Sequence, residues 1–195
     1  MDNGYKALIK TLKKDLPAVM NEHRYAHTVS VSIIAAILGT LYGEDAEKCE
    51  LCGLLHDAAK GIPETELILL CEKNGVELSE GEKAAPKVIH APYGAYLARV
   101  KYGIEDADIL NAIRFHTTGR ENMSTLEKII YIADFIEPGR REAECLYEAR
   151  RAAFTDLDRC MAVILKNTVQ YLKGRGQRIE EHTLSAYRFY GSEDI

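Results

Sequence analysis

The chain has 195 residues and a mass of 21.8 kDa, and 47% of its residues are hydrophobic, enough to build the core of one ordinary domain. Lys and Arg number 25 against 30 Asp and Glu, so the net charge of −5 disfavours a protein that binds nucleic acid through a basic surface. Five cysteines in a chain of this length do not form a disulfide framework, which favours a reducing cytoplasm.

The sequence also argues against export and against a membrane partner. The first residues carry charge and glycine where a signal peptide needs an apolar segment. The longest mostly apolar stretch, residues 29–41, is shorter than the about 20 residues that a bilayer-spanning helix needs. We therefore expect this stretch to be a buried helix.

A helical period recurs through the first part of the chain, and each segment ends at a recognisable stop. The pattern predicts a helix from Tyr5 to Leu16 that ends before Pro17, and a second over about residues 22–42 that ends at Gly43. A third is expected over about residues 45–59, ended by Gly61, and Pro63 opens a fourth.

The middle of the chain alternates polar connections with helix starts. Residues 77–87 are polar and predict a loop, and Pro92 then opens a helix, leaving His90 just ahead of its amino terminus. Another helix is expected over residues 106–115. Ser124 and Glu127 have the spacing of a capping box, which predicts a helix to about residue 136.

The last part predicts helices over about residues 141–153 and 156–172, a basic turn over 173–178, and a final helix with a frayed end within 179–195. No internal repeat or low-complexity linker divides the chain. We expect an all-α helical bundle forming a single domain over residues 1–195, in which helices of about 141–190 complete a motif-bearing part of about 22–140.

Several common catalytic motifs are absent, including the phosphate-binding loop, the dinucleotide fingerprint, the zinc-protease helix and the serine-hydrolase elbow. What stands out instead is a set of histidines and aspartates near helix ends or on helices with apolar flanks: His27, His56 with Asp57, His90, His116 and Asp134.

Imidazole and carboxylate donors together suit a first-row metal such as iron, manganese or zinc. A single histidine on an apolar face is more often a core residue than a ligand. However, the pair His56-Asp57 follows two leucines, and Asp134 lies within an apolar run, so their burial is costly unless they are paired or bind a metal. Taken together, the set favours a metal site.

Five blocks carry a more specific resemblance: RYAHT at 24–28, LLHDAAK at 54–60, HAPYGA at 90–95, RFHTTG at 114–119 and YIADFIEPGR at 131–140. In this order they resemble the HD-domain metal-dependent phosphohydrolase superfamily, and within it the bacterial YqeK family of symmetrical diadenosine tetraphosphate hydrolases. The resemblance covers about residues 24–178. It implies a single all-α HD domain.

The resemblance further implies an enzyme that cuts diadenosine tetraphosphate at its middle to give two ADP, through metal-activated water. It implies one or two iron ions, or manganese or another divalent metal, held by His27, His56, Asp57 and Asp134. His56, Asp57 and Asp134 are the expected catalytic residues. His90 and His116 match positions that serve a second metal or contact phosphate in related enzymes, and these two roles stay open.

The expected substrate-binding residues lie beside these positions. Each basic residue alone is more often a solvated surface charge, but next to a metal it is suited to bind phosphate. The set comprises Arg24, Lys60, His90, His116, Thr117, Asp134 and Arg140, together with Lys173, Arg175 and Arg178 of the basic turn. That turn reads equally well as a loop over the nucleotide or as a solvated connection. His23 and His182 have no predicted role.

Other readings remain. Cys49 and Cys52 share a helical face with His56 and could lie near the metal, although buried apolar side chains are favoured. The same fold also suits a phosphohydrolase of deoxynucleotides or of a guanosine alarmone, or a non-catalytic nucleotide sensor. No nucleic-acid partner is expected, and the sequence leaves a homodimer open.

Overall fold

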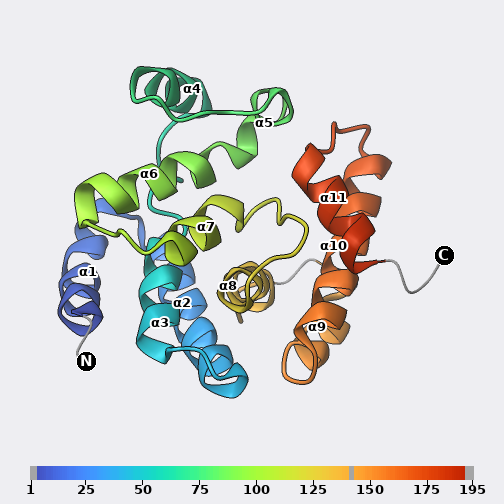
Figure 1. Ribbon diagram of the computed structural model, residues 1–195, viewed down its shortest axis with the longest axis horizontal. Coiled ribbons are helices and arrows are strands. Elements are labelled where there is room, and N and C mark those ends of the chain that lie inside the picture. The colour runs from blue at the N-terminus through green and yellow to red at the C-terminus, as the bar shows by residue number, and fades with distance from the viewer. Residues whose placement is uncertain (1–3, 141–142, 192–195) are drawn as a thin grey trace.

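The computed structural model describes residues 4–140 and 143–191, which form eleven α-helices and one 3₁₀ helix with no strand among them (Figure 1). The expected all-α fold is confirmed. In chain order the helices are α1 (Tyr5–Val19), α2 (Glu22–Tyr42), α3 (Ala46–Leu55), α4 (Glu64–Lys73), α5 (Glu80–Ala84), η1 (Pro86–Val88), α6 (His90–Tyr102), α7 (Ala107–Phe115), α8 (Thr125–Ile136), α9 (Leu146–Ala152), α10 (Leu157–Gly174) and α11 (Glu181–Tyr190).

Two small residues let α2 and α3 approach each other closely. A Cβ atom added to Gly53 would lie 2.6 Å from the Cα of Ser32, and one added to Gly39 would lie 2.6 Å from the Sγ of Cys49. A larger side chain at Gly53 would force the helices apart, because the backbone atoms that it meets cannot give way as a flexible side chain does. This contact fixes His27 on α2 relative to His56 at the end of α3.

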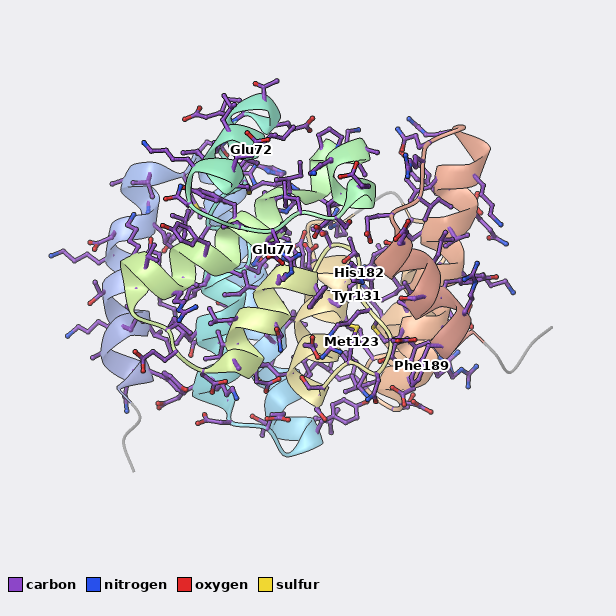
Figure 2. The ribbon with its side chains drawn as sticks, turned by 45° about the horizontal axis from the view of Figure 1, so that its top comes forward. Glu72, Glu77, Met123, Tyr131, His182 and Phe189 are labelled. Atoms are coloured by element: carbon purple, nitrogen blue, oxygen red, sulfur yellow. The ribbon has the colours of Figure 1, made fainter. Side chains whose placement is uncertain are left out.

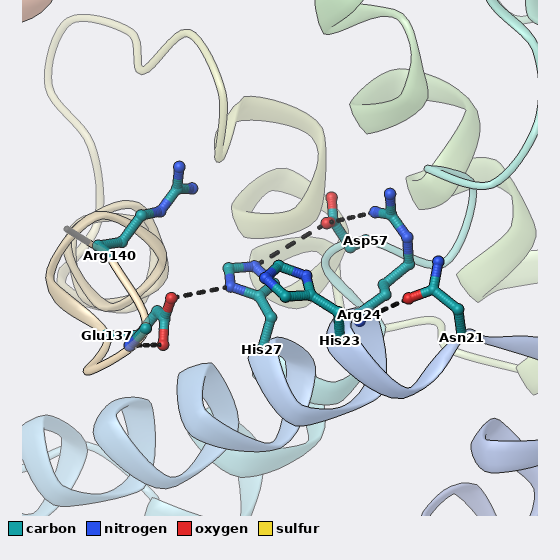
Figure 3. Close-up of a pocket in the computed structure, with 8 residues that line it drawn as sticks. Asn21, His23, Arg24, His27, Asp57, Glu137 and Arg140 are labelled. Atoms are coloured by element: carbon teal, nitrogen blue, oxygen red, sulfur yellow. Dashed lines mark hydrogen bonds and ion pairs between the residues drawn. The ribbon is translucent and has the colours of Figure 1, made fainter. Parts of the chain in front are cut away.

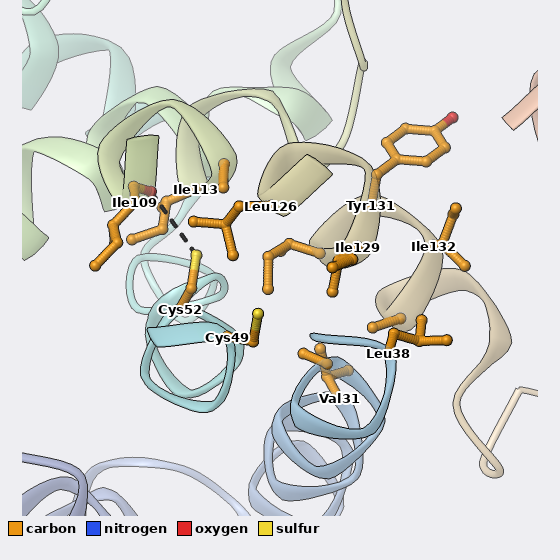
Figure 4. Close-up of a cluster of buried hydrophobic side chains, with 14 of the residues drawn as sticks. Val31, Leu38, Cys49, Cys52, Ile109, Ile113, Leu126, Ile129, Tyr131 and Ile132 are labelled. Carbon is orange, nitrogen blue, oxygen red and sulfur yellow. Dashed lines mark hydrogen bonds between the residues drawn. The ribbon is translucent and has the colours of Figure 1, made fainter. Parts of the chain in front are cut away.

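Helix α8 lies at the centre of the bundle, packed against α2, α3, α7, α9 and α10. Ile129, Ile130 and Ile132 are fully buried, and Figure 4 shows side chains of α8 facing those of α2 and α3. Because α8 is apolar on most of its surface, its one aspartate, Asp134, is brought to the middle of the molecule.

Cys49 and Cys52 belong to this core (Figure 4). Both are fully buried, and the thiol of Cys52 contacts the carbonyl oxygen of Ile109 at 3.8 Å. Burial raises the pKa of Cys49 to about 12 and that of Cys52 well above its ordinary value, which keeps both as inert thiols. The favoured reading of these cysteines as apolar core residues is confirmed.

The first helix is longer than predicted. It passes through Pro17 and ends at Val19. Proline leaves the carbonyl of Lys13, four residues earlier, without its helical donor. The Tyr25 hydroxyl donates to that carbonyl at 3.3 Å, so a tertiary contact replaces the missing hydrogen bond.

The third helix is shorter than predicted and ends at Leu55 instead of residue 59. Residues 56–61 continue as tight turns, with Ala58 donating to Leu55 and Lys60 to Asp57 at 3.0 Å each. Nδ1 of the His56 side chain is hydrogen-bonded to the Gly53 carbonyl oxygen at 2.6 Å. A regular helix would have used that carbonyl for a backbone bond, so the imidazole helps to end α3 and turns the His-Asp pair inward.

Three further boundaries differ from expectation. The segment 77–87 was expected to be a loop, but it contains α5, started by a capping box of Ser79 and Glu82, and then η1. His90 is the first residue of α6 rather than the residue ahead of it. Helix α9 begins at Leu146, later than the expected residue 141, which lies outside the described residues.

Helix α2 is the one helix among the described residues that is long and apolar enough to cross a membrane. Residues 29–41 alone are too short to cross a membrane, which is why the sequence predicted no such span. The whole helix is longer because it also includes the turns on either side of that stretch. A single helix of this kind is a poor indicator of a membrane protein, and α2 packs here against α1, α3 and α8.

The C-terminal helices cover one side of the bundle. Figure 2 shows His182 and Phe189 of α11 along the line where this helix meets Met123 and Tyr131. The Tyr190 hydroxyl accepts a hydrogen bond from the Met123 backbone N–H at 2.8 Å, and the ring of His182 meets Phe115 edge-on at 5.2 Å. Helix α11 therefore holds the loop between α7 and α8, which begins at His116.

Candidate metal centre

Three of the predicted histidines are held in the same way. In His56, His90 and His116, Nδ1 lies 2.6, 2.8 and 2.7 Å from the backbone carbonyl oxygen three residues earlier. A carbonyl only accepts hydrogen bonds, so Nδ1 carries the proton and the lone pair is on Nε2. All three rings therefore offer Nε2 as a donor atom.

Asp57 lies between two sets of these nitrogen atoms. Its Oδ2 is 4.0 Å from Nε2 of His27 and 3.8 Å from Nε2 of His56, whereas its Oδ1 is 3.2 Å from Nε2 of His90 and 3.5 Å from Nε2 of His116. Asp134 joins the first set, with Oδ1 3.1 Å from Nε2 of His27. We call His27, His56, Asp57 and Asp134 the first donor group, and Asp57, His90 and His116 the second.

The donor atoms are close enough to share an ion. In the triad His27, His56 and Asp57, and again in the triad Asp57, His90 and His116, the ligand atoms lie within 4.8 Å of one another. Within the described residues, Nε2 of His56 is one of two buried side-chain polar atoms that lack a hydrogen-bond partner. Such an atom is costly to bury, and a metal ion would satisfy it. The donor set fits a divalent first-row metal.

Electrostatics keep the two aspartates charged. Burial alone would raise the pKa of Asp57, but the facing imidazoles of His56, His116 and His90 bring it below its ordinary value. Burial opposes ionisation of Asp134 in the same way, and His27, His56 and Arg140 lower its pKa. Both carboxylates are therefore ready to bind a cation.

The surroundings of the histidines shift their pKa values in different directions. Burial lowers the pKa of His56, and it lowers that of His90 to about 4 despite the nearby carboxylate of Asp57. His27 differs, because its hydrogen bonds to Asp134 and Glu137 outweigh burial and raise its pKa. Without a metal, His27 is thus the ring that holds a proton between two carboxylates.

Three basic residues reach the donor groups, as expected from the sequence. Arg24 donates from Nη1 to Oδ2 of Asp57 at 3.2 Å, and Arg140 donates from Nη2 to Oδ1 of Asp134 at 2.9 Å. Nζ of Lys60 lies 3.1 Å from Nε2 of His90, and burial of the ammonium lowers its pKa. Thr117 has a buried hydroxyl oxygen with no partner, the second such atom in the described residues.

A cavity of about 230 Å³ opens beside the first donor group (Figure 3). Arg24 and Arg140 stand on opposite sides of His27 in this view. The cavity is lined by Asn21, His23, Arg24, His27, Asp57, Glu137, Gly139 and Arg140. It is therefore a polar space with two guanidinium groups, suited to an anion.

The basic turn is not joined to this centre. Lys173, Arg175 and Arg178 are exposed, and no hydrogen bond or ion pair between described residues connects them with either donor group. Arg175 lies over the ring of Tyr171 at 4.7 Å, and Arg178, after Lys83, contributes to lowering the pKa of Glu80. The turn faces α5 in its present position.

Sequence reasoning missed four residues that line the cavity: Asn21, His23, Glu137 and Gly139. Glu137 and Gly139 lie inside the block 131–140, and a signal for Glu137 was available, since it follows Asp134 by nearly one helical turn. Nothing in the sequence distinguished His23 from an exposed surface histidine.

The chain is similar to several known proteins. Residues 24–139 match the HD domain family. A protein of Halalkalibacterium halodurans called "Bis(5'-nucleosyl)-tetraphosphatase, symmetrical" is 44% identical over 86% of this chain and 89% of its own length. A protein of the same name from Bacillus subtilis is 40% identical, over 87% of this chain and 90% of its own.

A solved structure is similar along nearly the whole chain. It is a "predicted HD superfamily hydrolase involved in NAD metabolism" from Clostridium acetobutylicum, with a TM-score of 0.89 and 39% sequence identity over 95% of this chain and 97% of that one. The chain belongs to the HD domain family.

Proposed function

We propose that the chain hydrolyses diadenosine tetraphosphate symmetrically to two ADP, with a divalent metal held by His27, His56, Asp57 and Asp134. The observation that carries this proposal is the position of Asp57, whose two oxygen atoms face two different sets of histidine nitrogens. Relatives similar over most of their length bear the name of this activity.

A bound metal would polarise a phosphoryl oxygen and lower the pKa of a coordinated water molecule, which supplies a nucleophile near neutral pH. His56 and Asp57 would orient that ion, and Asp134 would complete its charge neutralisation. Arg24 and Arg140 stand where phosphate oxygens would approach, and a planar guanidinium can contact two such oxygens at once.

The second donor group supports a role in phosphate binding. It shares its one carboxylate with the first group, and the Lys60 ammonium lies against His90. A second divalent cation would meet that positive charge, whereas a phosphate would be attracted to it. We infer that His90, His116, Lys60 and Thr117 contact substrate phosphates, with one metal per chain.

We infer that this metal is iron, and manganese is the alternative. Two imidazoles and two carboxylates suit either ion, and they distinguish the site from a calcium site, which takes oxygen donors only. Elemental analysis of protein purified without added metal tests both the identity and the stoichiometry. One iron per chain is expected.

The decisive experiment is a product analysis. Purified protein with ferrous iron is incubated with diadenosine tetraphosphate, and the nucleotides are separated by anion-exchange chromatography. ADP alone supports the proposal, whereas ATP with AMP in equal amounts would overturn it. Faster turnover of deoxynucleotides or a guanosine alarmone in a parallel panel would favour another phosphohydrolase, and tight ADP binding without turnover would indicate a sensor.

We also infer that the protein works in the cytoplasm. All five cysteines are free, and four of them are buried. Free, buried thiols are typical of proteins in a reducing compartment. The homodimer stays a prediction.

A further inference from the structure

Glu137 is a buried carboxylate directly after α8. It is 4% exposed and faces two groups at once. Its Oε1 lies 3.3 Å from Nδ1 of His27, and its Oε2 accepts a hydrogen bond from the Gly139 backbone N–H at 2.6 Å. Figure 3 shows both contacts beside the cavity.

The contact with His27 differs from those of the other three histidines. In His56, His90 and His116, Nδ1 faces a backbone carbonyl of the same chain segment. His27 lies inside α2, where the nearby carbonyls are used by the helix itself. A carboxylate from a different element takes their place, and such a partner both orients an imidazole and makes it a stronger ligand.

The position of Glu137 is itself constrained. A Cβ atom added to Gly139 would lie 2.9 and 3.0 Å from the two carboxylate oxygens, so the carboxylate would have to move away. On the other side, the guanidinium of Arg150 donates to the backbone carbonyls of Ile136 and Glu137 at 3.0 and 2.9 Å. The turn after α8 is therefore built so that this carboxylate stays against His27.

We propose that Glu137 is the positioning residue of the metal centre, holding the Nδ1 proton of His27 so that Nε2 is presented to the metal, with Gly139 leaving the space that this requires. The inference rests on the proposed function, because it assigns a role at the same metal site.

Glu137 has to be a carboxylate because each of its two oxygen atoms accepts a hydrogen bond from a different donor. The His27 ring and the Gly139 N–H both donate to it, one to each oxygen. Glutamine has one acceptor oxygen and one NH₂ group, so one of the two donors would face another donor. The variant Glu137→Gln keeps the size of the side chain and removes this match, which makes it the sharpest test.

The test measures the dissociation constant for Mn²⁺ or Co²⁺ by competition with a chelator, using the full chain. Loss of a partner of a ligating histidine weakens metal binding by about 10- to 100-fold. We expect this loss in Glu137→Gln, with a changed visible absorption spectrum of the Co²⁺ form, because His27 is reoriented. The control is Glu82→Gln, which alters a buried carboxylate in the first turn of α5, away from the metal centre. It should retain the wild-type affinity for metal and the wild-type Co²⁺ spectrum.

Gly139→Ala provides a second test that does not alter Glu137 itself. It should weaken metal binding in the wild-type background, because the added methyl group displaces the carboxylate. In the Glu137→Ala background it should have no further effect, since no carboxylate remains to be displaced. Equal losses in both backgrounds would mean that Gly139 acts independently of Glu137.

The outcomes separate the two proposals. A wild-type protein that binds metal and turns over substrate, with Glu137→Gln of the same affinity and Co²⁺ spectrum, would overturn the positioning role and leave the function intact. A wild-type protein that binds no divalent metal would overturn the proposed function, and with it this inference.

Discussion

The two donor groups share Asp57 but differ in charge and in surroundings. The first has two carboxylates and borders the cavity with Arg24 and Arg140. The second has only the shared carboxylate, is buried on all its residues, and has the Lys60 ammonium against His90. The first group can therefore neutralise a divalent cation. The second group is better suited to bind an anion, because its single carboxylate also belongs to the first group.

This difference shows how the His56-Asp57 pair contributes to two sites with different roles. Asp57 follows His56 in a tight turn, so one oxygen faces α2 and the end of α3 while the other faces α6 and the end of α7. The histidines on both sides have similar geometry, with Nε2 facing inward. The role of each group is therefore decided by the charges around it and not by the imidazoles themselves.

The largest expected effect comes from removing the shared residue. Asp57→Asn keeps the size of the side chain but removes the charge that both groups use. Metal content should fall to background, and hydrolysis of diadenosine tetraphosphate should fall by at least about 1,000-fold, since metal catalysis contributes several kcal/mol. Elemental analysis and steady-state rates measure this. A variant that retains the metal and a tenth of the activity would show that the groups do not depend on Asp57.

The second prediction concerns the metal-free protein and the buried imidazole of His90. Its folded pKa is about 4, below the ordinary 6.5, so between these values the unfolded chain binds a proton that the folded chain does not. Stability should therefore fall as pH drops from 6.5 to 4, by about 3 kcal/mol for this residue. Urea unfolding at several pH values measures the slope.

His27 should behave in the opposite sense, which sharpens the contrast between the groups. Its folded pKa is raised by Asp134 and Glu137 against the effect of burial. Its contribution to stability is complete below pH 6.5 and is lost as pH rises through the folded pKa. His90→Gln should therefore flatten the acid side of the stability profile, and His27→Gln the alkaline side. Identical profiles for the two variants would contradict this division.

The third prediction separates phosphate binding from metal binding. Lys60→Met removes the ammonium beside His90 and should leave one metal per chain. The loss of a charge-assisted contact to phosphate should lower kcat/KM by about 10- to 100-fold. Lys83→Met, at an exposed lysine that pairs with Glu80, is the matched control and should have wild-type kinetics. A second metal ion appearing in Lys60→Met would show that Lys60 excludes a metal instead of binding substrate.

Helical periodicity was sufficient for the fold class, because it is a local signal, and the five sequence blocks, through their resemblance to a known family, indicated histidines and aspartates that the structure brings close together. The sequence was insufficient where tertiary contacts decide the outcome. Tyr25 satisfies the carbonyl that Pro17 leaves free, so α1 continues where a local rule ends it. The role of Glu137 depends on its distance from His27, 110 positions earlier, and no local pattern contains that information.

The smallest expected effect belongs to the basic turn, which lies apart from both donor groups. Replacing Lys173, Arg175 and Arg178 together by Gln should raise KM by about two- to five-fold at low salt, with metal content and kcat unchanged, because exposed charges contribute little and are screened.

The control for the turn is a second triple variant with the same change in charge. Lys6, Lys10 and Lys14 on α1 are exposed, and α1 lies at the opposite end of the bundle from α10 and α11 (Figure 1). Replacing them by Gln should leave KM unchanged. A rise in KM that is specific to the turn and disappears at high salt would show that residues 173–178 attract the substrate electrostatically, even though they face α5 in this structure. Equal KM values for both triple variants at low salt would assign the turn to a solvated connection.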